Sequence, residues 1–163
     1  NHIFNWTIYP RFSELKNANG DVVCYRPFQV MEKVEIQNLT FQTIEVNHKV
    51  PTIGIIVSDE KSKIALTSDT AQMDGFWELI NNQENCDALL IECAFPNELS
   101  ELAKSSHHLT PSGLEKELEK FSQTCPIYVV NIKPMYRDKI VDEIKSLNNP
   151  QINILEVGKS YEF

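Results

Sequence analysis

The order of predicted strands and helices indicates an α/β protein built on one mixed sheet. Two predicted hairpins come first, at residues 34–46 and 53–67, because short apolar runs flank polar turns there. Apolar strands then follow at 87–93, 127–132 and 152–157, and they alternate with segments of helical periodicity. Paired hairpin strands followed by strands that alternate with helices predict a mixed sheet with helices covering one face.

Four segments with a helical spacing of apolar residues connect the later strands. Thr110 and Pro111 are residue types preferred at the N-cap and in the first turn of a helix, and they begin the third segment. Asn148, Asn149 and Pro150 close the fourth. The four segments are 74–82, 97–105, the one that begins at 110, and 137–147.

The chain of 163 residues fits a single domain that can bury a core without disulfide or metal staples. Within the range 1–163, residues 1–27 are irregular and predict a connecting segment with short strands, and residues 28–163 carry the sheet and helices. The first methionine is Met31, so we expect the sequence to begin inside a longer polypeptide.

Charge and cysteine usage restrict the partners and the compartment. A net charge of −8 argues against nucleic-acid or anionic-membrane binding, because surfaces that bind either are normally basic. The four cysteines lack a C-x-x-C spacing and mostly lie beside apolar runs, which predicts buried, reduced thiols in a cytoplasmic protein. No apolar run has the length of a transmembrane helix and no signal peptide is visible.

Polar residues stand at the ends of the predicted strands: His48, Asp69, Glu92, nearby His108, and Asn131. Side chains at strand ends and in the loops after them converge on one rim of a sheet, where sites are usually built. Imidazole and carboxylate groups are ligands for zinc, manganese or iron. Two such ions lower the pKa of bound water and clamp the oxygens of a phosphodiester.

Each of these residues also has a structural explanation. Taken alone, His48 is more often a hydrogen-bonded histidine than a ligand, and Asp69 before a threonine is more often a capping residue. His107 and His108 are compatible with a solvated loop pair. Glu92 is harder to explain structurally, because burying a carboxylate without a partner costs free energy.

Several motifs in order resemble the metallo-β-lactamase fold hydrolases, and within them the class II cyclic-nucleotide phosphodiesterases and the related transfer-RNA 3′-processing endonucleases. Their order and approximate spacing match over nearly the whole chain. The motifs are His2-Ile3-Phe4-Asn5-Trp6 with Tyr9-Pro10, His48-Lys49-Val50-Pro51 with Gly54, Ser68-Asp69-Thr70, Glu92-Cys93-Ala94-Phe95, and His108-Leu109-Thr110-Pro111.

The resemblance implies an αββα sandwich of which this chain is the C-terminal half. It implies two divalent metal ions, zinc foremost with manganese or iron as alternatives, with His48 as a ligand of one ion and Asp69 bridging both. Glu92 and His108 look like the pair that, in these enzymes, assists proton transfer to the leaving oxygen. A histidine oriented by a carboxylate can act as a general acid near neutral pH.

Two features depart from the family pattern. The first metal-binding motif, His-x-His-x-Asp-His, is absent from the sequence. Asn131 stands where the family has a final histidine ligand, and an amide oxygen is a poorer zinc ligand than imidazole.

The resemblance implies a metal-dependent hydrolase of a 3′,5′-cyclic nucleotide. The expected partners are that small molecule and the N-terminal half of the same fold, with a homodimer as an open alternative and no membrane. Two competing hypotheses are a catalytically degenerate module that binds a ligand or partner, and an RNA 3′-processing endonuclease. The acidic charge balance disfavours the endonuclease.

Overall fold

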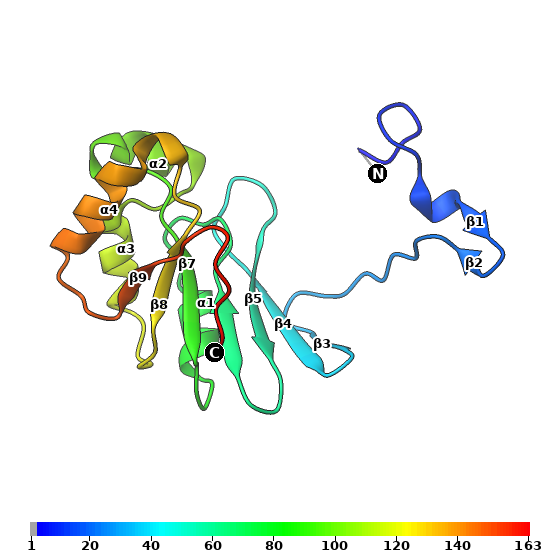
Figure 1. Cartoon of the computed structure of the whole chain (residues 1–163), viewed down its shortest axis with the longest axis horizontal. Coiled ribbons are helices and arrows are strands. Elements are labelled where there is room, and N and C mark those ends of the chain that lie inside the picture. The colour runs from blue at the N-terminus through cyan, green and yellow to red at the C-terminus, as the bar shows by residue number, and fades with distance from the viewer. Residues whose placement is uncertain (1–2) are drawn as a thin grey trace.

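Seven strands form one continuous sheet in the computed structural model, which describes residues 3–163 (Figure 1). The strands follow chain order across the sheet; β3 to β6 are antiparallel, and β6 to β9 are parallel. The predicted mixed sheet is therefore confirmed. The strands are β3 (Lys33–Ile36), β4 (Leu39–Glu45), β5 (Ile53–Ser58), β6 (Lys63–Leu66), β7 (Ala88–Glu92), β8 (Ile127–Val130) and β9 (Ile152–Ile154).

Both predicted hairpins form, as β3–β4 and β5–β6. The β5–β6 turn is stabilised by Asp59, whose Oδ1 accepts hydrogen bonds from the backbone N–H groups of Lys61 and Ser62. These two hydrogen bonds lower the pKa of the Asp59 carboxyl group. An aspartate that bonds the backbone a few residues further on is a typical turn former.

All four predicted helical segments contain helices. Thr110 caps α3 as expected, because its Oγ1 accepts a hydrogen bond from Gly113 N at 3.2 Å. The helices are α1 (Gly75–Asn81), α2 (Ser100–Ser106) after a 3-10 turn at Asn97–Leu99, α3 (Pro111–Leu118), and α4 (Arg137–Ser146) after a 3-10 turn at Pro134–Tyr136.

One face of the sheet is buried beneath helices. Ile56, Ala65, Leu89 and Ile127 lie side by side on β5 to β8 and are all buried. Removing their apolar area from water is the main stabilising contribution to such a core. The same core cluster includes apolar residues of three helices, namely Phe76, Trp77 and Ile80 of α1, Leu114 of α3, and Ile140 and Ile144 of α4.

A close approach explains the glycine in β5. A Cβ atom at Gly54 would lie 2.8 Å from a ring carbon of Phe76 and 3.0 Å from a methyl group of Val46. A larger residue would therefore push α1 away from the sheet. The packing of α1 on the sheet requires glycine at this position.

The opposite face of the sheet is apolar but only partly buried. Ile55, Leu66, Leu90 and Tyr128 form a row across β5 to β8 on this face, and each is partly exposed. The C-terminal segment crosses this face (Figure 1), where the ring of Phe163 contacts Tyr128. Residues 33–163 thus form one seven-stranded sheet with its helices, which corresponds to one half of an αββα sandwich.

The N-terminal segment lies apart from the sheet (Figure 1). It contains a 3-10 turn at Phe12–Glu14 and a short hairpin of β1 (Lys16–Asn17) and β2 (Gly20–Asp21). His2, which opens the first motif of the resemblance, lies outside the described residues. The division of the chain between residues 27 and 28 stays a prediction.

Two strands, β8 and β9, end at least two residues earlier than the sequence predicts. β8 ends at Val130 rather than at residue 132, because Asn131 adopts a left-handed backbone with φ of 56°. β9 ends at Ile154 rather than at residue 157. The predicted burial of free thiols is confirmed for Cys86, Cys93 and Cys125. Across residues 3–163, no helix combines the length and hydrophobicity needed to cross a bilayer.

Candidate metal and proton-transfer site

The polar residues singled out in the sequence meet at one edge of the sheet. Asp69 follows β6, Glu92 is the last residue of β7, and Asn131 follows β8. These three strands are parallel, so their carboxyl ends lie at the same edge. The loop from β4 to β5 brings His48 to this edge, and the loop from α2 to α3 brings His108.

Three of these side chains form a compact group of metal-ligand types. Ring nitrogens of His48 and His108 and a carboxylate oxygen of Asp69 all lie within 4.8 Å of one another, and the three residues are partly buried. The two imidazole rings are in edge-to-face contact, with centroids 5.0 Å apart. The structure therefore brings His48 and Asp69 together, and His108 joins them.

Glu92 is a fully buried carboxylate that holds His108 in place. Its Oε1 lies 2.6 Å from His108 Nδ1 and accepts a hydrogen bond from Thr70 N at 3.0 Å. Its Oε2 accepts one from Leu109 N at 3.4 Å. Charge-assisted hydrogen bonds of this kind offset the cost of burying the carboxylate. Because the carboxylate accepts from Nδ1, the Nε2 atom of His108 is left for the site.

His48 is oriented in the same way by a backbone carbonyl. Its Nδ1 lies 3.0 Å from the carbonyl oxygen of His107. A carbonyl oxygen can only accept, so Nδ1 carries the proton and Nε2 presents a lone pair. The His107 ring itself turns to another partner, with its Nδ1 2.9 Å from Asn47 Oδ1. His107 thus contributes its backbone, rather than its ring, to this group.

Asn131 contacts the aspartate at the centre of the group. Its Nδ2 donates a 2.8 Å hydrogen bond to Asp69 Oδ1. Asn131 therefore acts as a donor to the carboxylate, in the place where the resemblance implies a histidine ligand. One of the two oxygens of Asp69 is engaged by this bond.

Left-handed backbone conformations cluster around the site, at Ser68 (φ 56°), His107 (φ 57°) and Asn131 (φ 56°). The first two directly precede Asp69 and His108 in the chain. Non-glycine residues enter this region at a cost in free energy and are enriched where a fold must aim functional side chains. The backbone is thus strained at three points that direct the polar group.

The donor set fits one divalent transition-metal ion. Two imidazoles and one carboxylate are a known ligand combination for zinc and for non-haem iron. Cys93 is unsuited to bind metal, because burial, together with the charge of neighbouring Glu92, raises the pKa of its thiol well above the ordinary value. A second ion finds fewer donors among the described residues, since Asn131 presents an N–H group to Asp69.

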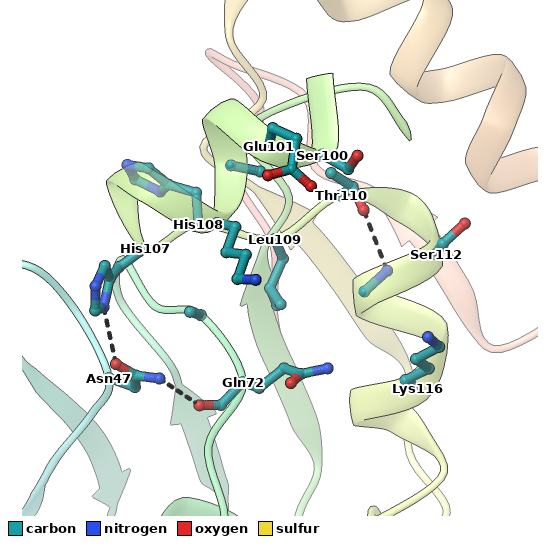
Figure 2. A pocket seen from close by; sticks show the side chains of 14 residues that line it. Asn47, Gln72, Ser100, Glu101, His107, His108, Leu109, Thr110, Ser112 and Lys116 are labelled. Carbon is teal, nitrogen blue, oxygen red and sulfur yellow. Dashed lines mark hydrogen bonds between the residues drawn. The ribbon is translucent and has the colours of Figure 1, made fainter. Parts of the chain in front are cut away.

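A pocket of about 690 Å³ adjoins this group between α2, α3 and the chain near residue 72 (Figure 2). Asn47 lies on one side, where its Nδ2 donates to the carbonyl oxygen of Gln72 at 2.8 Å. Lys104, His108 and Lys116 also line the pocket. Sequence reasoning missed the two lysines and Gln72, because the pocket walls come from segments far apart in the chain.

Neither a protein-family model nor a curated protein matches the sequence. Solved structures do match it. The chain superposes on the metallo-beta-lactamase fold protein YhfI from Bacillus subtilis with a TM-score of 0.70 and 18% identity, over 90% of its own length. This chain has the metallo-β-lactamase fold.

Two further structures support the metallo-β-lactamase fold. The short form of human tRNase Z superposes over 76% of the chain, with a TM-score of 0.56 and 16% identity. Zn²⁺-bound PqqB from Methylobacterium extorquens superposes over 83%, with a TM-score of 0.63 and 13% identity. The chain spans 58% of YhfI, 42% of the tRNase Z and 55% of PqqB, which is about half the length of these proteins.

Proposed function

We propose that the chain is part of a metal-dependent phosphodiester hydrolase that acts on a 3′,5′-cyclic nucleotide. The observation that carries the proposal is the buried Glu92–His108 pair, which lies at the same edge of the sheet as His48 and Asp69. The metallo-β-lactamase fold and the name of one of its members, tRNase Z, support phosphodiester chemistry. The Zn²⁺-bound neighbour supports zinc as the metal.

The chemistry divides between the metal and the protein. A bound divalent ion would lower the pKa of water and neutralise phosphoryl charge. His48 and Asp69 hold it in this proposal. His108, held by Glu92 through Nδ1, presents Nε2 to the leaving oxygen and protonates it as a general acid. Glu92 fixes the orientation of the His108 ring for this step.

The pocket beside His108 suits a small anionic substrate better than RNA. Its volume of about 690 Å³ falls in the range of small-molecule sites. Its walls carry two lysines, Lys104 and Lys116, against one carboxylate, Glu101. RNA binding would need an extended basic surface, and the net charge of the chain is −8.

The apolar face of the sheet is where a second half of the fold would pack. A complete αββα sandwich has two sheets, and the row from Ile55 to Tyr128 offers a partly exposed apolar surface for the second. We propose that the N-terminal half of the fold packs there and supplies the His-x-His-x-Asp-His ligands. A second copy of this chain is the alternative occupant.

A catalytically degenerate binding module is the competing function, and Asn131 favours it. Its amide donates to Asp69 where the resemblance implies a ligand. Metal content and hydrolysis by the complete protein distinguish the two functions. Less than one ion per complete fold, with no hydrolysis of cyclic AMP or cyclic GMP, would favour the binding module.

The test of the hydrolase is to compare Asp69→Ala with His107→Ala in the complete protein. We expect Asp69→Ala to reduce cyclic-nucleotide hydrolysis to background, and His107→Ala to retain most of it, because the His107 ring contacts Asn47. Hydrolysis is measured by product formation with cyclic AMP and cyclic GMP. Equal losses from the two variants would contradict the assigned roles.

A further inference from the structure

His48, Asp69 and His108 each have two atoms that could bind a metal ion. In each side chain, one of these atoms makes a hydrogen bond to a neighbouring residue and the other does not. His48 Nδ1 is bound to a backbone carbonyl, and His108 Nδ1 to Glu92. Asp69 Oδ1 accepts the Asn131 amide. The atoms left over are His48 Nε2, Asp69 Oδ2 and His108 Nε2.

These supporting contacts are those that metal sites require. A histidine ligand usually donates its second ring N–H to a carboxylate or a backbone carbonyl, which fixes its tautomer and orientation. His108 has the first kind of support and His48 the second. Both therefore carry the lone pair on Nε2 before any ion arrives, so binding does not require a change of tautomer.

We propose that this chain alone forms a complete site for one divalent transition-metal ion, with His48, Asp69 and His108 as its three ligands. The resemblance assigns the first two to metal; His108 is the addition. Metal–nitrogen bonds of about 2.1 Å separate neighbouring ligands of a tetrahedral site by about 3.4 Å, so side chains within 4.8 Å need to close by about 1.4 Å at most.

In this proposal, Asn131 is the reason that this half of the fold binds one ion and does not form a two-ion site. Its amide donates to Asp69 Oδ1, so Oδ2 is the oxygen that we assign to the metal. Asn131 is thus a positioning residue that orients the aspartate through one of its oxygens. Histidine at this position would offer a ring nitrogen as a ligand for a second ion.

This three-ligand site rests on the metal dependence of the proposed function but gives His108 another role. The Nε2 atom of His108 cannot bind an ion and donate a proton at the same time. His108 is therefore a ligand when this chain binds one ion alone, and a proton donor in the proposed reaction of the complete fold.

The test is calorimetric titration of the 163-residue chain with Zn²⁺. We expect one equivalent to bind, His108→Ala to weaken binding by about tenfold or more, and the matched control His107→Ala to bind like the parent chain. Circular dichroism checks that each variant is folded. Unchanged affinity in folded His108→Ala would overturn the inference.

A second measurement avoids substitutions. In ¹⁵N spectra of the parent chain, Zn²⁺ should shift the Nε2 resonances of both His48 and His108 and leave those of His107 in place. A shift of His48 without one of His108 would exclude the ligand role. If both shift while the complete protein hydrolyses no cyclic nucleotide, the proposed function fails and the metal site stands.

Discussion

Two glutamates are completely buried among residues 3–163, and their surroundings differ. Glu92 ends β7 and contacts His108, a titratable residue at the rim of the sheet. Glu117 lies in α3, where its Oε2 accepts hydrogen bonds from Met73 N at 3.1 Å and from Trp77 Nε1 at 2.7 Å. Its Oε1 pairs with a lysine ammonium group in the next turn at 2.9 Å. Both carboxylates are satisfied, but by different kinds of partner.

Burial of a carboxylate therefore does not identify a site by itself. Glu117 ties α3 to the chain around α1, and its partners include a backbone amide and an indole that perform no proton transfer. Glu92 holds a histidine whose second nitrogen faces other potential ligands. The chemistry of the residue that the carboxylate orients separates the glutamate of the proposed site from the structural one.

Glu117→Ala should destabilise the fold more than any other change to these two networks. It leaves the Trp77 and Met73 N–H groups buried without this acceptor and removes one of the two carboxylate partners of Lys120. We expect a loss of about 3–5 kcal/mol in the free energy of unfolding, measured by urea denaturation. Glu115→Ala, at an exposed position of the same helix, should stay within about 0.5 kcal/mol. An equally small loss of unfolding free energy in Glu117→Ala and Glu115→Ala would contradict the structural role of Glu117.

Exchanging each glutamate for glutamine separates metal binding from stability. Glu92→Gln should weaken Zn²⁺ binding or hydrolysis about 10–100-fold, because the neutral amide orients His108 less firmly. It should also cost about 1–3 kcal/mol of stability, since a buried N–H donor is left without a proper acceptor. Zn²⁺ affinity is measured by calorimetry under conditions where both variants are folded.

Glu117→Gln is the matched control for that measurement. It removes a buried charge of the same type but touches none of His48, Asp69 and His108. We expect lower stability with unchanged Zn²⁺ affinity. Equal loss of affinity in the two glutamine variants would mean that both act through global stability, and the distinction between the two glutamates would disappear.

The burial of Glu92 could be predicted from the sequence, whereas the burial of Glu117 could not. Glu92 ends a run of apolar residues, so its burial could be predicted directly. Glu117 stands between Glu115 and Glu119 in a helix, where a charged residue normally faces solvent. Its burial depends on the position of Trp77, and that contact joins residues 40 apart. Local patterns cannot predict such a contact.

The same limit applies to the rest of the fold and site. Strands and helices followed from apolar periodicity, and the meeting of His48 with Asp69 followed from the hairpin between them. The early end of β8 could not be predicted from local sequence, because the left-handed backbone of Asn131 is accompanied by a hydrogen bond to Asp69, 62 residues away. Tertiary contacts of this kind decide strand ends, side-chain directions and the pocket.

Lys120→Met should have the weakest effect, and it tests how much the charge pair adds to the Glu117 network. The side chain of Lys120 is 36% exposed, so solvent screens the pair, and we expect a cost of about 1 kcal/mol or less at pH 7. Partial burial lowers the pKa of Lys120, but hydrogen bonds to Glu117 and Asp74 outweigh it and raise the pKa above its ordinary value.

A raised pKa in the folded state gives the pH dependence a definite sign. The stabilisation is fully present below the pKa of an unfolded lysine, about 10.4, and is lost as the pH rises through the higher folded value. Urea denaturation from pH 9 upward should therefore show the parent chain and Lys120→Met converging in stability above about pH 10.4. Lys116→Met, at an exposed position of α3, should show no such convergence. If the gap between the parent and Lys120→Met persists at high pH, the uncharged amine stabilises the fold by hydrogen bonding, and the charge of Lys120 adds nothing to the burial of Glu117.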